Sequence, residues 1–219
     1  KLNPFIVLLG KGDHPITSIW FNQSGREFAT TLDITRSNVT FVGTGKDTTT
    51  IFGGFRIDNF ENITFKQMTV TNTSERGMGI NMSNAKVELF DVALKGCSSI
   101  GLYVSSYSSV RTVVATRCEF ANSQDGTAIM GSLASATFNN CVFHDNSRDG
   151  VYGFQSTIHL HGEATAVHSN SLRGIYAFNS GKVLIHLPSH HNTCYNNRSE
   201  DRKTSSGGTI TNVFTRRLM

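Results

Sequence analysis

Three consecutive segments of the chain each begin with glycine and follow one pattern: GLYVSSYSSVRTVVATRCEFANSQD (101–125), GTAIMGSLASATFNNCVFHDNSRD (126–149) and GVYGFQSTIHLHGEATAVHSNSLR (150–173). A similar unit precedes them at Gly79 and another follows at Gly174, so the units begin 22, 25, 24 and 24 residues apart. Weaker units upstream bring the total to about seven. Repetition at a fixed period indicates an architecture in which each unit packs on its neighbours.

Each unit contains three short stretches with the pattern of a β-strand. In the Gly79 unit the apolar pairs are Ile80 and Met82, Val87 and Leu89, and Val92 and Leu94. A spacing of two residues places both side chains on one face of a strand. Three strands in about 24 residues, with no helical periodicity, exclude a leucine-rich horseshoe, a helical solenoid and a propeller. The repeat therefore predicts an all-β, three-sheet parallel solenoid of about seven turns of 22–28 residues.

This geometry also predicts which side chains stack from turn to turn. The residues directly after the unit glycines are expected to point inward in one column. They are Ile80, Leu102, Thr127, Val151 and Ile175.

Asparagine recurs near one bend of the predicted coil. Stacked Asn amides can hydrogen-bond along a coil, and Asn tolerates the left-handed conformation that a tight corner requires. We therefore expect a structural ladder near this bend, which the Gly79 unit interrupts with Cys97. Its predicted members are Asn72, Asn122, Asn146, Asn170 and Asn196.

With these features, the sequence resembles the right-handed parallel β-helix of the pectate-lyase-like superfamily. The segments FIVLLGKGDH (5–14), LDITRSNVTFVGTGKDTTTIFGG (32–54) and FRIDNFENITFKQMTVTN (55–72) look like the first coils of that superfamily. In texture the chain is similar to multicopy β-helix proteins of algae and large algal viruses. The resemblance implies a first coil or cap over 1–31, a β-helix over 32–197, and a basic cap or tail over 198–219.

Composition and charge exclude several functional classes. The net charge is +4, and five basic against two acidic residues lie from Arg198 onward, so the body is nearly neutral and lacks the basic stripe of a nucleic-acid binder. No apolar run reaches the ~20 residues of a membrane span. The four cysteines form no CxxC pair, so we expect neither a zinc site nor a disulfide scaffold.

Enzymes of the resembled superfamily carry signatures that this chain lacks, so we expect a non-catalytic protein without cofactor or metal. One cluster leaves catalysis open as an alternative. His144 and His168 occupy the same repeat position, Arg148 and Arg173 follow them, and His159, His161, His186, His190 and His191 lie on the same turns. A lyase or epimerase acting on an acidic glycan needs a base and a cation, which this His/Arg cluster would supply.

A second repeat position collects aromatic side chains. Alternation along the strand predicts that they face solvent, where an aromatic plane can hold the apolar face of a sugar ring. The predicted glycan-binding residues are Tyr103, Tyr152, Phe154, Tyr176 and Phe178.

The sequence thus predicts a carbohydrate-binding or structural protein at an extracellular, cell or virion surface. A second alternative to this function is a purely structural spike that self-associates through the open ends of its solenoid.

Overall fold

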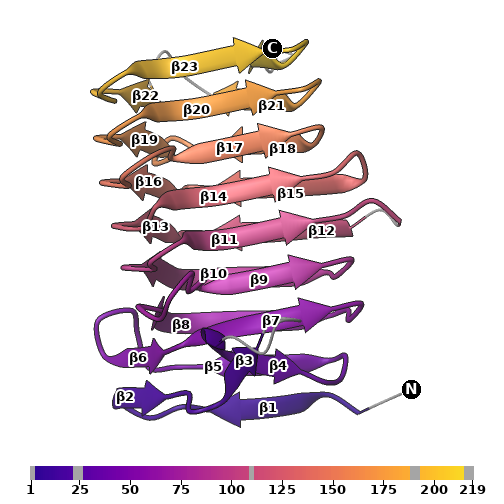
Figure 1. Cartoon of the computed structure of the whole chain (residues 1–219), viewed down its shortest axis with the longest axis vertical. Coiled ribbons are helices and arrows are strands. Elements are labelled where there is room, and N and C mark those ends of the chain that lie inside the picture. The colour runs from indigo at the N-terminus through magenta and orange to yellow at the C-terminus, as the bar shows by residue number, and fades with distance from the viewer. Residues whose placement is uncertain (1–2, 22–26, 109–110, 188–192, 215–219) are drawn as a thin grey trace, which may run out of the picture.

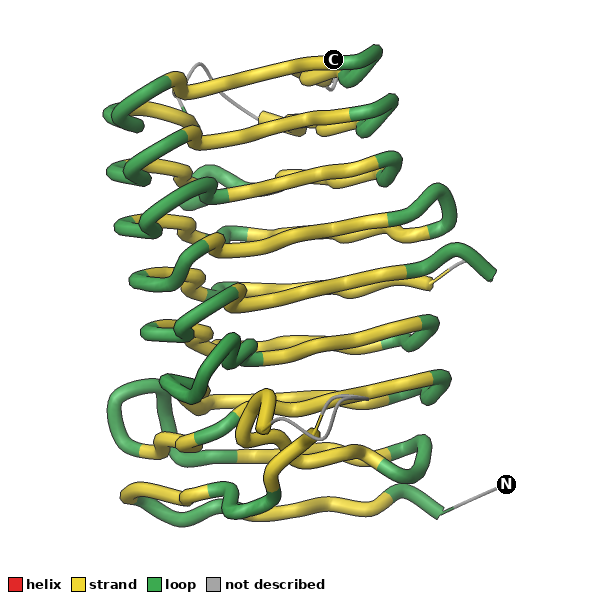
Figure 2. The backbone as a smooth tube through the Cα atoms, viewed as in Figure 1, coloured by secondary structure: helices red, strands yellow, loops and turns green. Residues whose placement is uncertain are grey.

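A computed structural model describes residues 3–21, 27–108, 111–187 and 193–214. The chain winds into a stack of turns along one long axis, with β1 and β2 at one end and β23 at the other (Figure 1). The described residues form strands, turns and loops without a helix, as Figure 2 shows, so none of them belongs to a helix that could cross a membrane. His190 and His191 lie outside the described residues. The all-β solenoid with parallel sheets is confirmed.

The strands lie on three faces of the coil. Face 1 is a nine-stranded sheet of β3 (Ile19–Phe21), β4 (Glu27–Ile34), β7 (Gly54–Asp58), β9 (Ile80–Ser83), β11 (Ile100–Ser105), β14 (Asp125–Met130), β17 (Val151–Phe154), β20 (Arg173–Phe178) and β23 (Glu200–Ser205). Face 2 contains β1 (Phe5–Leu8), β5 (Val39–Val42), β12 (Arg111–Thr116), β15 (Ala134–Asn139), β18 (Thr157–His161), β21 (Lys182–Leu187) and β24 (Thr209–Phe214). Face 3 contains β2 (Gly12–Pro15), β6 (Thr49–Phe52), β13 (Glu119–Ala121), β16 (Val142–His144), β19 (Ala166–His168) and β22 (Cys194–Tyr195).

Two long strands, β8 (Ile63–Thr71) and β10 (Val87–Lys95), run through the bend between faces 2 and 3 and join them into one 15-stranded sheet. The bend is a left-handed residue at the same repeat position, Gln67 with φ 55° and Asp91 with φ 52°. Apart from the antiparallel β3–β4 pair, the paired strands are parallel. Residues 1–31, expected as a first coil or cap, include β1 and β2, which pair with β5 and β6. Residues 198–219 include β23 and β24, which extend faces 1 and 2.

The predicted inward column is confirmed. Each member pairs with the next across face 1, and the side chains of all five are fully buried. Thr127 is the polar member, and its hydroxyl has no hydrogen-bond partner among the described residues. Next to this column, Phe120 and Phe143 stack at 4.9 Å, and both meet Phe138 edge-on. Buried apolar side chains stack from turn to turn but differ in size, as Ala115, Phe138 and Leu160 do in one column.

The unit glycines are required by close approach of the backbone from turn to turn. A Cβ atom at Gly126 would lie 2.6 Å from the carbonyl oxygen of Gly150, and one at Gly101 would lie 2.7 Å from that of Gly126. Any side chain at these positions would push two turns apart, so the glycines set the repeat.

The Asn ladder exists, but two of its predicted members are wrong. Asn122 and Asn196 are exposed and left-handed, with φ of 52° and 56°, and they form the corner itself. The ladder position is one residue later and is filled by Ser123, which is buried, and Asn197, which is partly buried. The amide of Asn146 donates to Oδ1 of Asn170 at 2.9 Å, and that of Asn170 donates to Oδ1 of Asn197 at 2.8 Å. Asn72 occupies the equivalent place near the start, buried and bonded to two backbone carbonyls.

Candidate functional site

A depression opens on the outer side of face 1, over β14, β17 and β20. Its volume is about 230 Å³. The floor includes Ala128, whose small side chain leaves a gap between the larger residues of the neighbouring turns. The lining residues are Ile100, Asp125, Ala128, Met130, Arg148, Asp149, Tyr152, Arg173 and Tyr176.

Two carboxyl groups lie at one rim of the depression, each directly before a unit glycine. Asp125 and Asp149 belong to consecutive turns and are 6% and 1% exposed. The backbone N–H of Asp149 donates to Oδ1 of Asp125 at 3.0 Å, which ties the two positions together. Neither residue was among the site residues predicted from the sequence. Their shared position before glycine was the signal that could have identified them.

Arginines from the same and the next turn balance these carboxyl groups. Arg173 donates from Nε and Nη2 to the two oxygens of Asp149 at 2.8 and 2.9 Å, and its guanidinium lies 3.7 Å from the ring centre of Tyr176. Among the described residues, the ion pair of Arg148 is a 3.7 Å contact with Asp125, and its side chain is half exposed. Burial raises the pKa of Asp125, and the neighbouring arginines only partly offset this effect. The two carboxyl groups therefore have different surroundings.

Next to the carboxyl groups, four aromatic side chains form a continuous surface on β17 and β20, which we call the aromatic platform: Tyr152, Phe154, Tyr176 and Phe178. The ring centres of Tyr152 and Tyr176 are 5.4 Å apart, and those of Phe154 and Phe178 are 5.5 Å apart. All four are partly exposed, so they face outward as the alternation predicted. Tyr103 faces the same side, but Ala128 lies between it and Tyr152 in the register, so it is separate from the platform.

The predicted His/Arg cluster is not one group. His144 and His168 stack on face 3, with ring centres 5.3 Å apart, as their shared repeat position predicted. The ring nitrogens of His144 contact Asp145 at 2.6 Å and Glu119 at 3.3 Å. Within the described residues, Arg148 and Arg173 instead form ion pairs with Asp125 and Asp149, the carboxyl groups of the depression. Burial and the adjacent His144 lower the pKa of His168.

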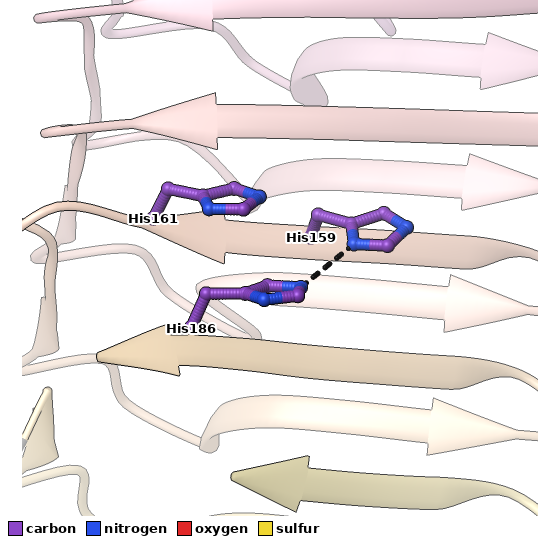
Figure 3. A group of neighbouring side chains, drawn as sticks. All are labelled: His159, His161 and His186. Atoms are coloured by element: carbon purple, nitrogen blue, oxygen red, sulfur yellow. Dashed lines mark hydrogen bonds between the residues drawn. The ribbon is translucent and has the colours of Figure 1, made fainter. Parts of the chain in front are cut away.

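A histidine cluster on face 2 was not expected as a site. Side chains of His159 and His161 on β18 and His186 on β21 converge on the outside of the coil (Figure 3). The signal for it was an i, i+2 pair of histidines followed, one repeat later, by a third.

A sequence comparison identifies the family of this chain. The profile described as "Right handed beta helix region" matches residues 78–215, which is more than half of the chain. The chain belongs to this family. A search of curated proteins gives no match.

Solved structures share the same β-helix. A pectin methylesterase from Yersinia enterocolitica superposes with a TM-score of 0.59 at 15% identity, over 95% of this chain and 88% of its own. Pectate lyase Pel9A gives a TM-score of 0.52 at 12% identity, over 98% and 69%. The ORF18 protein of Geobacillus virus E2 gives 0.55 at 14% identity, and this β-helix spans 39% of its length. At such identities the likeness shows the fold, which carbohydrate-active enzymes and a viral protein have in common.

Proposed function

We propose that this β-helix binds a glycan across the outer side of β14, β17 and β20. The observation that carries the proposal is the aromatic platform beside the depression, where Tyr152 and Tyr176 both reach the lining. Exposed aromatic planes bury large apolar area while the tyrosine hydroxyls remain available for hydrogen bonds. A row of rings repeated from turn to turn suits a polymer whose own units repeat.

The ligand class that we propose is an acidic polysaccharide. Arg148 lies in the depression with its side chain half exposed, and its ion pair within the described part of the chain is a long one with Asp125, so it can pair with a sugar carboxylate. Two structural neighbours are named for pectin and pectate. Fragments of these polymers are therefore the first ligands to test. Such binding would act at an extracellular, cell or virion surface.

Calorimetric titration of the purified chain with pectate fragments tests this function. Tyr152→Ala and Tyr176→Ala should each weaken binding by about 0.5–1.5 kcal/mol, or roughly two- to twelvefold in Kd. Phe90→Ala is the control, because Phe90 is an exposed aromatic residue on β10, away from the platform. Binding that survives both tyrosine changes, or that falls equally in the control, would rule out the platform. If no glycan binds, the purely structural role becomes the better proposal.

A second candidate function is hydrolysis of the bound glycan or its esters. It is favoured by the two carboxyl groups of the depression, because Asp125 has a raised pKa whereas Asp149 is paired with a permanently charged guanidinium. Two carboxyl groups whose surroundings differ in this way are the usual pattern for an acid and a nucleophile or base. The lyase or epimerase alternative has less support, since its arginines pair with these aspartates.

The Asp125→Asn variant distinguishes glycan binding from glycan hydrolysis. A binding protein should keep its affinity and show no turnover before or after the change. A hydrolase should release methanol or reducing sugar from pectin, and the variant should lose about 10²–10⁴-fold of that rate, the usual contribution of a positioned acid or base. Turnover that persists in Asp125→Asn but disappears in His168→Ala would favour the lyase or epimerase instead.

A further inference from the structure

Three imidazoles meet on the outside of face 2, where two neighbouring turns are in register. His159 and His161 are two residues apart on β18 and so lie on the same side of it, and His186 on β21 pairs directly with His161. Nδ1 of His159 lies 2.9 Å from Nε2 of His186. One ring nitrogen from each histidine lies within 4.8 Å of the other two. In Figure 3 the rings of His161 and His186 lie one above the other and extend toward His159.

The three rings are partly exposed and close enough together to share one ion. The rings of His161 and His186 are parallel to within 8°, with centres 4.1 Å apart. The cluster contains only histidines. An uncharged Asn139 and Val213 occupy the register positions before His161 and after His186.

We propose that His159, His161 and His186 bind one divalent transition-metal ion, for which zinc is the best-suited candidate. Neutral imidazole nitrogen is a preferred donor for zinc, copper and nickel, whereas magnesium and calcium prefer oxygen. Zinc takes nitrogen at about 2.0–2.1 Å in a tetrahedron, so small side-chain rotations would bring the three nitrogens around one ion. The fourth position would remain for water or an exogenous ligand. Such an ion would link β18 to β21 and thus one turn to the next.

The stack of His144 and His168 on face 3 provides a comparison for the three-histidine cluster on face 2. On face 3, His144 and His168 are followed by Tyr195 in the same column, with ring centres 5.3 and 5.1 Å apart. That column supplies two imidazoles, one above the other, and it is an ordinary ladder of stacked rings. On face 2 the i, i+2 pair adds a third nitrogen from the side. One turn earlier the same two positions hold Thr137 and Asn139, so the three-histidine arrangement belongs to β18 and β21.

Zinc titration of the untagged chain, stripped with EDTA and followed by calorimetry at pH 7.5, tests the proposal. We expect one zinc ion per chain. His161→Asn and His186→Asn should each weaken binding by at least about tenfold, since even groups that only support metal ligands contribute 10–100-fold. His161→Asn is conservative for the fold, because β15 carries Asn139 at this register. His14→Asn, which removes a histidine from β2 at the other end of the coil, is the control.

Cobalt provides a readout that does not depend on the variants. Co²⁺ in the parent chain should give the intense visible absorption of a four-coordinate site. Zinc should displace the Co²⁺, and the zinc-bound chain should have a higher Tm than the metal-free chain. Thermal unfolding in EDTA checks that each variant is folded. If His161→Asn is not folded, the test depends on His186→Asn alone. The proposal is overturned if the parent binds no zinc at 100 μM, if the histidine variants bind as tightly as the parent, or if His14→Asn weakens binding equally.

Discussion

Residues at one repeat position become neighbours in space, so their charges must be compatible along the stack. One repeat position holds Asp125, Asp149 and Arg173, each directly before a unit glycine, and then Glu200, which is in register with Arg173. Asp149 is in register with Arg173 and forms a bidentate pair with it, whereas Asp125 is in register with Asp149 and has only a 3.7 Å ion pair with Arg148 among the described residues. The mismatch falls at the depression, where burial and the neighbouring carboxylate both disfavour the charge on Asp125. A column that is otherwise complementary therefore contains one carboxyl group in an unfavourable place.

Asp125→Asn should stabilise the fold at neutral pH and have no effect in acid. A carboxyl group whose pKa is raised on folding favours the native state below its unfolded pKa of about 3.9, and this stability is lost as the pH rises through the folded pKa. The gain from Asn should approach about 1.4 kcal/mol for each unit by which the pKa is raised. Urea unfolding at pH 3.5, 5 and 7 measures it.

Asp91→Asn is the control of opposite sign. A hydrogen bond from Arg117 lowers the pKa of Asp91, and both its oxygens accept from that guanidinium at 2.7 Å. The stability from Asp91 is present above its unfolded pKa and is lost as the pH falls. This variant should therefore be less stable than the parent at pH 7 and equal to it in acid. A loss of stability in Asp125→Asn at pH 7 would show that its ion pair outweighs its burial.

Two consecutive residues form the corner between faces 3 and 1, and they have different structural roles. The first residue takes the left-handed conformation and is exposed, as in Asn122, Asp145, Ser169 and Asn196, with φ between 52° and 57°. The second turns its side chain inward and bonds to the next turn. Asn suits both tasks, because it tolerates the left-handed region and its amide both donates and accepts. Composition alone could not distinguish the two positions, and this explains the one-residue error.

Asn146→Ala should destabilise the chain by about 2–6 kcal/mol, because it removes the side-chain bonds to the buried N–H of Ser123 and the carbonyl of Phe120, at ~1–3 kcal/mol each. Thermal or urea unfolding measures the loss. Asn122→Gly is the matched control, since glycine accepts the left-handed corner and the exposed side chain of Asn122 is outside the ladder. Equal destabilisation by the two changes would place Asn122 in the ladder after all.

At the scale of the whole molecule, each turn bonds to the turn before it and the turn after it. This explains why the fold was predictable: a 24-residue period and pairs spaced by two determine both the strands and the stacking of Leu102 on Ile80. The candidate sites were less predictable, because each combines residues of two or three turns. The ion pair of Asp149 with Arg173 and the meeting of His161 with His186 depend on register, which varies with unit lengths of 22 to 25 residues.

Deletion of residues 126–149 should give a folded chain that is one turn shorter. The deletion joins Asp125 to Gly150, the same dipeptide as Asp149–Gly150, and brings Leu102 onto Val151 in the inward column. Asp125 then takes the position that pairs with Arg173. Circular dichroism should retain a β spectrum with one cooperative transition, and small-angle scattering should show a shorter particle, by about 4.8 Å. Deletion of 126–137, half a turn, should abolish folding because it puts every column out of register.

The serial stacking of turns also governs how the chain would respond to a pulling force applied between its ends. A turn at either end is held by one neighbour only, so turns should peel away singly while the rest of the coil stays intact. Each 24-residue turn adds about 4.8 Å to the folded length but releases about 80 Å when extended. A tether of this kind lengthens in nearly equal steps and dissipates work at each one. An ion linking β18 to β21 would make one of those steps later and stronger than the others.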